Sequence, residues 1–358
     1  MTKLGGVGWG GAHKVSVMLA NDLAQKGYDV TFTVSQEDRV DYPIDPSIRI
    51  FHLTGRFRAS KFRPLNLIKK MFAFRRLCKE EKIDVVVGFT SNMAIYTVFA
   101  ALLSRRKALI SERTDPHLEP RRKLLRGLRN LTFCFADRVV FQTPGARDYY
   151  PRVVRNKGEI IPNPISDQLP TRYTGERERR IVNYCRIAPQ KNLRVLLDAF
   201  ALFFQSHPDH VLEIYGDARE GDTYKESLIA YAKTLPCSER IYFYPACTDV
   251  HQKAVRAGVF ASSSDYEGIS NSMLEALAMG MPVVVTDCAN GGERMCIEDG
   301  KSGLIVPCRD PQAMATAMSR LVDDQQLAVS MSQQAALIRE RFSMEKIFAA
   351  WEAIVEKL

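Results

Sequence analysis

Closely spaced cysteines are missing from this 358-residue sequence, and with them two classes of site. The eight cysteines lie scattered along the chain without a Cys-x-x-Cys pair. Structural zinc sites need closely spaced ligand pairs, and disulfide-based scaffolds need much denser cysteine. We therefore expect no cysteine-bound metal and reduced, mostly buried thiols of the kind found in the cytosol.

A long apolar run and a start-of-chain signal sequence are missing too. The first ten residues are rich in glycine rather than apolar. The most apolar stretch, residues 85–103, is interrupted by Thr90, Ser91 and Asn92. It therefore predicts a buried strand, a loop and a helix rather than a membrane span, and a cytoplasmic location is expected.

Positive charge is distributed unevenly along the chain. Residues 1–168 contain 29 Lys and Arg against 16 Asp and Glu, a net charge of +13, whereas the rest contains 21 against 25, a net of −4. Residues 56–82 mix cations with apolar side chains at helical spacing, and residues 120–129 are also basic. This pattern is typical of a helix on an anionic membrane surface, the alternative being the solvated face of an ordinary helix. Nucleic acid is not expected, because no aromatic stacking platform is interleaved with the cations.

Short β-branched runs alternate with helix-length amphipathic runs, which predicts a parallel α/β architecture. The proline- and charge-rich residues 161–180 separate two such series and are typical of an interdomain connection. We expect an N-terminal domain over residues 1–166, a C-terminal domain over 167–340, and a helix within 341–358 that packs back on the first domain. Two doubly wound, Rossmann-like sheets would face a cleft, with ligands at the carboxyl ends of their strands.

Glycines near the start of the chain suggest an anion-binding turn. Gly8, Gly10 and Gly11 precede a predicted helix, where glycines let backbone N–H groups approach an anion. The alternative is a tight strand-to-helix turn without a ligand. No Gly-Lys-Ser/Thr follows this loop, which excludes a P-loop. Because only a few residues precede the glycines, we expect the first strand of this domain to be very short or missing.

Two cations follow the first predicted strand of the second domain. Arg186 and Lys191 lie between the end of this strand and the next helix. A cation in the first turn of a helix is electrostatically unfavourable unless an anion is nearby, so Lys191 is better explained by an anionic ligand than as a surface residue. The Arg fork and the Lys point charge together suit a diphosphate.

Two glutamates flank a small, polar junction later in this domain. Glu267 lies in the loop after a predicted strand and Glu275 in the first turns of the next helix, so they would reach different parts of one ligand. The free N–H groups at the helix start, near Ser270 to Ser272, predict a second anion site. The alternatives are a solvated loop acid for Glu267 and a capping box from Ser272 to Glu275.

These blocks resemble one known family. The segments "CRIAPQKN", "YGDARE", "SDYEGISNSMLEALAMGMPVVVTD" and "GGERMCIEDGKSGLIVP" are similar in order and spacing to family 4 glycosyltransferases over roughly residues 160–307. The opening "GGAHKVSVMLANDLAQKGYDVTFTV" is similar to that family's first loop and helix. The resemblance implies a GT-B fold, in which two Rossmann-like domains face a cleft, and retaining transfer from a nucleotide-sugar without a metal.

The resemblance also implies roles for individual residues. Arg186 and Lys191 would hold the donor diphosphate and stabilise it as the leaving group, while Glu267 would contact the sugar hydroxyls. Glu275 would bind the ribose, and backbone N–H groups would cradle the sugar and the phosphates. The implied donor-binding residues are Gly10, Gly11, Gly268, Ile269, Ser270, Asn271 and Glu275.

The first domain departs from the family pattern in "LISERTD". Many members carry a histidine in this loop, where the matching position here is Arg113. The candidate acceptor or donor contacts are therefore Glu112, Arg113, Thr114 and Asp115. Cys185 replaces a usual glycine and His13 a common acid, and neither change removes the diphosphate-binding pair.

Together these features predict a retaining glycosyltransferase, peripheral on the inner face of the plasma membrane. It would move a hexose or N-acetylhexosamine from a UDP-sugar to a lipid-linked saccharide in surface-polysaccharide or glycan assembly, and no metal or other cofactor is expected. One alternative is a nucleotide-sugar epimerase on the same fold. Another is a non-catalytic nucleotide-sugar-binding partner.

Overall fold

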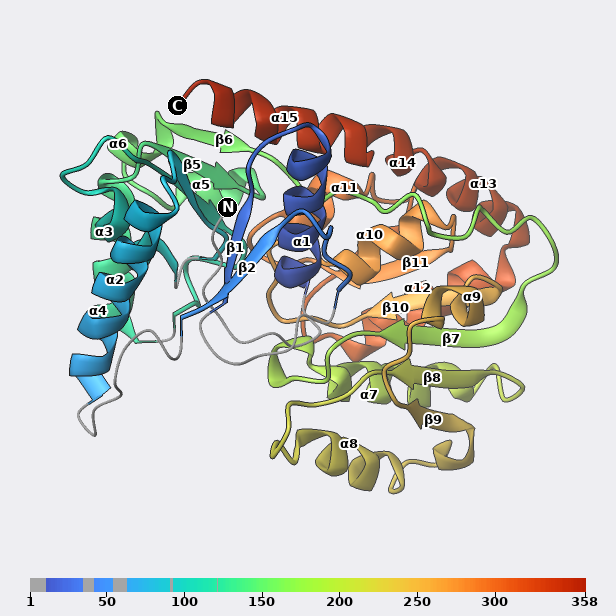
Figure 1. Cartoon of the computed structure of the whole chain (residues 1–358). Helices are drawn as coiled ribbons and strands as arrows, with labels where there is room; N and C mark the ends of the chain where they lie inside the picture. The colour runs from blue at the N-terminus through green and yellow to red at the C-terminus, as the bar shows by residue number, and fades with distance from the viewer. Residues whose placement is uncertain (1–10, 35–41, 54–62, 91–92, 121) are drawn as a thin grey trace. The chain divides into compact units, whose positions relative to one another are not determined.

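The computed structural model describes residues 11–34, 42–53, 63–90, 93–120 and 122–358, and it divides into two compact units (Figure 1). Unit 1 comprises Met1–Asn163 together with Glu345–Leu358, and unit 2 comprises Pro164–Met344. Gly10, to which a donor contact is assigned above, lies outside the described residues. Each unit is an α/β body with its own parallel sheet, which confirms the predicted fold class of two Rossmann-like domains.

Unit 1 contains a four-stranded sheet with the strand order β3-β4-β5-β6, and a separate parallel pair, β1-β2. All of these pairings are parallel. The strands are β1 (Thr31–Val34), β2 (Arg49–His52), β3 (Val85–Gly88), β4 (Lys107–Glu112), β5 (Arg138–Phe141) and β6 (Gly158–Ile160). The helices are α1 (Gly11–Gln25), α2 (Arg63–Glu80), α3 (Ala94–Ala101), α4 (Lys123–Cys134), α5 (Pro144–Asp148), α6 (Arg152–Arg155) and α15 (Met344–Glu356).

The C-terminal helix α15 completes the core of unit 1. Its Trp351 is fully buried and stacks on Phe89, the residue after β3, with the ring centroids 5.5 Å apart. Lys26, just after α1, forms a salt bridge with Glu352 at 2.8 Å. An aromatic contact of this kind contributes beyond simple burial, whereas the half-exposed ion pair contributes little.

Unit 2 contains a six-stranded parallel sheet with the strand order β12-β11-β10-β7-β8-β9. The chain enters at the central strand β7, builds outward through β8 and β9, and then returns to build β10, β11 and β12 on the other side. The reversal between β7 and β10 is the switch point of a doubly wound sheet, where such folds bind ligands. The strands are β7 (Glu178–Tyr184), β8 (Val211–Tyr215), β9 (Ile241–Tyr244), β10 (Ala257–Ser262), β11 (Val283–Thr286) and β12 (Leu304–Val306).

Helices α7 and α12 pack against each other over this sheet, and α10 packs on β10 and β11. Strand β11, the last four residues of β7 and most of β10 are buried, as expected for central strands of a parallel sheet that is covered on both faces. The α-helices are α7 (Leu193–Phe204), α8 (Tyr224–Ala232), α9 (Val250–Ala254), α10 (Asn271–Ala278), α11 (Gly292–Cys296), α12 (Pro311–Asp323), α13 (Gln325–Ala336) and α14 (Ile338–Arg341).

The stretch at residues 85–103 forms strand β3, a connection and helix α3, as its polar interruption predicts. Among the described residues, no helix is both long enough and apolar enough to cross a bilayer. All eight cysteines are free, four of them buried and four half-buried.

Candidate active site

The loops after β7, β10 and β11 meet at the carboxyl edge of the unit 2 sheet. Ser263 Oγ donates to the carbonyls of Lys191 and Asn192, both at 3.0 Å. The Asp265 amide donates to the Gln190 carbonyl at 2.9 Å. These bonds hold the end of β10 against the turn that follows β7. The switch point thus carries a defined set of side chains rather than two independent loops.

Lys191 and Glu267 form a salt bridge at this edge. Lys191 Nζ lies 2.5 Å from Glu267 Oε1, and the two side chains are only 12% and 10% exposed. Ser264 Oγ donates to the same oxygen at 2.9 Å, and Gln190 Nε2 to Oε2 at 3.3 Å. Burial by itself lowers the pKa of Lys191, but the adjacent carboxylate outweighs it and the net pKa is raised. Lys191 is therefore a permanent cation, next to an acid that its neighbours hold in place.

Arg186 lies on the same loop but is exposed. Its guanidinium acts electrostatically on Lys191 and on the half-buried Cys185, so the two cations belong to one electrostatic site. Within the part of the chain that the structure describes, no carboxylate forms a salt bridge with Arg186. The site therefore combines one buried, paired cation with one exposed cation.

The start of α10 lies directly after Glu267. Ser270 is its N-cap and accepts a hydrogen bond from the Met273 amide at 3.5 Å, and Gly268, Ile269 and Ser270 are buried. The N–H groups of a helix's first turn have no partner within the helix, and they give the junction a partial positive charge that suits an anion. Asn271 is the first helical residue and is half-buried.

The capping-box alternative for Glu275 is wrong. The N-cap is Ser270 rather than Ser272, so Glu275 lies too far along the helix for that role. Its Oε2 instead lies 3.0 Å from His251 Nε2 on α9. Tyr184 at the end of β7 donates to the Ser272 carbonyl at 3.1 Å. Glu275 is thus held by an ionisable partner on a neighbouring helix.

Glu293 is a second buried acid in this region to which no role was assigned from the sequence. It is 2% exposed, and Oε2 has no hydrogen-bond partner among the described residues. Burial raises the pKa of Glu293 to about 8, and the Glu267 carboxylate adds to this shift. Just before it, a Cβ on Gly292 would lie 2.0 Å from the Gly268 carbonyl oxygen, so only glycine permits this approach. The two glycines before the acid in "GGERM" are the sequence feature from which this buried acid could have been predicted.

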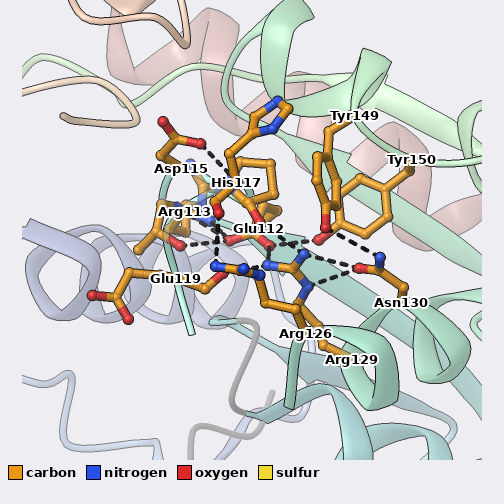
Figure 2. Close-up of polar contacts among 12 residues, drawn as sticks. Glu112, Arg113, Asp115, His117, Glu119, Arg126, Arg129, Asn130, Tyr149 and Tyr150 are labelled. Carbon is orange, nitrogen blue, oxygen red and sulfur yellow. Dashed lines mark hydrogen bonds and ion pairs between the residues drawn. The ribbon is translucent and has the colours of Figure 1, made fainter. Parts of the chain in front are cut away.

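In unit 1, Glu112 is fully buried at the end of β4 and saturated by hydrogen bonds (Figure 2). Its Oε1 accepts from Thr114 Oγ1 at 2.9 Å and from two backbone amides, and Oε2 accepts from Tyr150 at 2.7 Å. Arg129 on α4 adds a salt bridge at 3.7 Å. Burial raises the pKa of Glu112, opposed by these partners. The carboxylate organises the loop that follows it.

The same loop positions the other candidates. Asp115 is 2% exposed and accepts from the His117 amide at 2.8 Å, which closes a turn. Arg129 Nη2 donates to the Pro116 carbonyl at 3.0 Å and so anchors that turn to α4. Thr114 is half-buried, and Arg113 is buried beside Phe89. Gly11 begins α1 and is exposed.

Two models of known families match the chain. The model of "Glycosyl transferases group 1" matches residues 171–337, and that of "Glycosyltransferase Family 4" matches residues 9–169. The chain belongs to the GT-B glycosyltransferases. The match of the second model to unit 1 and of the first to unit 2 follows the division seen in the structure.

Relatives that match almost the whole length of the chain are also named as glycosyltransferases. An uncharacterized glycosyltransferase of Haemophilus influenzae is 25% identical over 349 residues, covering 97% of this chain and 96% of its own. A Campylobacter jejuni enzyme is also 25% identical and covers 98% of this chain and 96% of its own. It is named as an α-1,4-N-acetyl-D-galactosaminyltransferase acting on a diNAcBac-PP-undecaprenol-linked saccharide. The amylovoran biosynthesis glycosyltransferase AmsD of Erwinia amylovora is 23% identical over 97% of this chain and 96% of its own.

Solved structures agree on the fold. HepE of Anabaena, crystallised with UDP and glucose, superposes with a TM-score of 0.85 at 17% identity, covering 100% of this chain and 99% of its own. A sucrose-phosphate synthase of Thermosynechococcus elongatus gives 0.85 at 18% identity, over 99% of this chain and 98% of its own. The GT-B glycosyltransferase fold is thus shared across chains of very different sequence.

The buried acid Glu293 makes the stability of unit 2 depend on pH. Its folded-state pKa of about 8 lies above its ordinary value of 4.5. Between these values the unfolded state loses the proton that the folded state keeps, so stability is lost as the pH rises through this window. Glu293→Gln should remove this loss. Its free energy of unfolding, relative to that of the wild type, should therefore rise by at least about 1.4 kcal/mol between pH 5 and pH 8.

Urea unfolding at a series of pH values measures this difference. Glu298→Gln is the control, because that side chain is 66% exposed, and it should keep the wild-type pH profile. Parallel pH profiles for the wild type and Glu293→Gln would contradict the assignment.

Proposed function

We propose that the protein is a family 4 retaining glycosyltransferase that moves a hexose or N-acetylhexosamine from a UDP-sugar to a lipid-linked saccharide during surface-polysaccharide or glycan assembly. The observation that carries the donor half is the Lys191–Glu267 salt bridge beside the start of α10, at the switch point of the unit 2 sheet. It combines a cation for the diphosphate with an acid for the sugar hydroxyls.

The donor chemistry follows from these groups. As the bond between the sugar and the diphosphate breaks, negative charge grows on the diphosphate oxygens. Lys191, Arg186 and the N–H groups at the start of α10 would stabilise that charge. Glu267 would accept hydrogen bonds from the sugar, and Glu275, held by His251, would bind the ribose hydroxyls.

Names of relatives support the substrate classes. The Campylobacter jejuni relatives are named as N-acetylgalactosaminyltransferases that use undecaprenol-diphosphate-linked acceptors, and HepE was crystallised with UDP-glucose. A UDP-sugar donor and a polyisoprenyl-linked acceptor are therefore the first pair to test. An epimerase on the same fold would instead convert the free donor, and a binding partner would take up UDP without turnover. Product analysis by mass spectrometry separates the three.

Replacing Lys191 tests the donor site. Lys191→Ala should weaken UDP binding at least tenfold, equivalent to about 1.4 kcal/mol, because it removes the buried cation of the diphosphate site. Isothermal titration with UDP measures the change. Lys301→Ala is the matched control, since Lys301 is 69% exposed and pairs with the exposed Glu298 on the surface. Unchanged UDP affinity in folded Lys191→Ala would overturn the diphosphate role.

We further propose that transfer needs no metal, because Lys191, Arg186 and the α10 N-terminus can neutralise the leaving diphosphate by themselves. Turnover of a UDP-sugar should then be the same, within about twofold, with excess EDTA and with added Mg²⁺ or Mn²⁺. Radiolabelled sugar transfer to a lipid-linked acceptor provides the measurement. Loss of turnover in EDTA that added metal restores would contradict this part of the proposal.

For the membrane, we propose that α2 and α4 of unit 1 dock on an anionic lipid surface. Their exposed apolar side chains include Phe72 at 60%, Leu124 at 85% and Leu131 at 57% exposure. Helix α3 packs against both helices, and the exposed cations Arg122 and Lys123 lie at the start of α4. Apolar side chains that enter the headgroup region, next to cations that attract anionic lipid, are the pattern of a peripheral membrane helix.

Vesicle binding tests this surface. The wild type should sediment with phosphatidylglycerol vesicles at low salt and not with phosphatidylcholine vesicles. Leu124→Ser combined with Leu131→Ser should reduce binding at least fivefold, because both side chains are exposed and their loss leaves the core intact. Val329→Ser, at a 55% exposed position on α13 of unit 2, is the control. Equal sedimentation of the double variant and the wild type would contradict the assignment.

A further inference from the structure

Arg113 is a buried cation at the carboxyl end of β4. It is 7% exposed, and its guanidinium carbon lies 4.5 Å from the Phe89 ring centroid and 5.2 Å from that of Trp351. Both rings belong to unit 1, as Arg113 does. A charge in such a place is costly unless an anion or several hydrogen bonds compensate it. The pKa of Arg113 is lowered to about 9 by this burial.

Glu112, the nearest acid, attracts Arg113 electrostatically and so opposes the lowering of its pKa, but it forms no salt bridge with Arg113. Glu112 precedes Arg113, but its carboxylate accepts from Thr114, Tyr150 and backbone amides, and its salt bridge is with Arg129. No salt bridge to Arg113 is present among the residues that the structure describes. Arg113 is therefore a buried cation that has no salt-bridge partner in the described part of the chain.

Arg129 shows how this fold treats a structural arginine (Figure 2). It lies close to the same loop and is equally buried, and its nitrogens meet Glu112, Asn130 and the carbonyls of Pro116 and Glu119. Among the described residues, Arg113 has one such bond, from Nη1 to Asn163 Oδ1 at 3.0 Å. Its Nε and Nη2 have no hydrogen-bond partner in the described chain. The contrast indicates that these two donors are reserved for something other than the protein.

The two unpaired nitrogens lie on one edge of the guanidinium. Their N–H groups point in parallel, which is the fork that matches the two oxygens of a carboxylate or of a phosphate. Lysine, as a point charge, would not offer this geometry. The shape of the unused edge therefore identifies the class of group that it would bind.

Gln142 and Asn163 extend this polar cluster. Gln142 directly follows β5, and Asn163 follows β6, so both lie at the same edge of the sheet as Arg113. Gln142 Nε2 donates to Asn163 Oδ1 at 2.7 Å, and this is the oxygen that also accepts from Arg113. Gln142 Oε1 is buried without a hydrogen-bond partner in the described residues. The cluster thus offers a donor fork together with a free acceptor for a hydroxyl group.

We propose that Arg113, Gln142 and Asn163 form a specificity subsite in unit 1 for an oxyanion of the substrate, either the carboxylate of an acidic sugar or a phosphate of the lipid carrier. This inference rests on the proposed function, because it takes the ligand to be part of a glycosyl substrate. It is separate from the donor diphosphate site, which Lys191 and Arg186 of unit 2 provide. A neutral hexose would leave the guanidinium uncompensated and would bind less well.

The test uses the full wild-type chain saturated with UDP, so that the donor diphosphate site is already occupied and does not take up the added anion. Glucuronate and farnesyl diphosphate are titrated separately by calorimetry and thermal shift, with glucose as the neutral control. We expect at least one anion to bind and to raise the melting temperature, and glucose to do neither. Glucuronate binding alone identifies a sugar carboxylate, and farnesyl diphosphate binding alone a carrier phosphate. Binding of neither anion overturns the proposal.

Two variants saturated with UDP in the same way locate the binding. Arg113→Met keeps the length of the side chain without its charge, and it should weaken the anion at least tenfold. Arg113→Lys keeps the charge without the fork of parallel N–H groups, and it should also weaken the anion at least tenfold. Because Arg113→Lys keeps the buried charge, it decides the question even if Arg113→Met does not fold.

An anion affinity within twofold of the parent in the folded variants overturns the subsite. UDP titration of Arg113→Met in the otherwise wild-type chain separates this failure from that of the proposed function. If Arg113→Met binds UDP normally and its anion affinity is unchanged, only the subsite is wrong. If the wild type does not bind UDP, the donor proposal is wrong.

Discussion

The salt bridge between Lys191 and Glu267 is the constraint around which the donor side of unit 2 is built. Its two residues come from loops 76 positions apart in the chain, after β7 and after β10. Neither would be stable alone at this depth, since an isolated buried charge costs several kcal/mol. The hydrogen bonds from Ser264 and Gln190, and those of Ser263 to the opposite loop, keep the pair in register. The charged groups of the site are thereby preorganised in the folded protein before any ligand binds.

The parallel sheets explain why the chemistry gathers where it does. In a parallel sheet every strand ends at the same edge, so the residue after each strand joins a common row. Arg113, Gln142 and Asn163 make such a row in unit 1, and the loops carrying Lys191, Glu267 and Asn290 make one in unit 2. The same geometric rule has produced two polar sites of different charge balance. In unit 2 the buried cation, Lys191, is paired with a carboxylate of the protein. In unit 1 no described carboxylate forms a salt bridge with the buried cation, Arg113.

Much of this arrangement was predictable from local sequence patterns. The strand and helix periodicities placed Lys191 and Glu267 in loops at strand ends, and residues 85–103 as a strand, a connection and a helix. Their pairing was not predictable, because contacts between distant loops leave no periodic signal in one sequence. The pairing of Glu275 with His251, and the Ser270 cap in place of Ser272, depend on the exact helix start, which patterns define only to within a residue or two. The burial of Arg113 and Glu293 could not be predicted either, since it depends on which side chains from other parts of the chain pack against them.

Unit 1 draws its core from two segments that are synthesised far apart in time. Trp351 on α15 stacks on Phe89, and both lie over Arg113, yet the whole of unit 2 separates α15 from the rest of unit 1. At a translation rate of about 5 to 20 residues per second, the nascent unit 1 waits roughly 10 to 40 s for this helix while residues 164–344 are made. During that time the face of Phe89 is open, and unit 2, being one continuous segment, is free to fold first. The core of the first domain therefore cannot be completed until the whole of the second domain has been synthesised, although the first domain comes earlier in the chain.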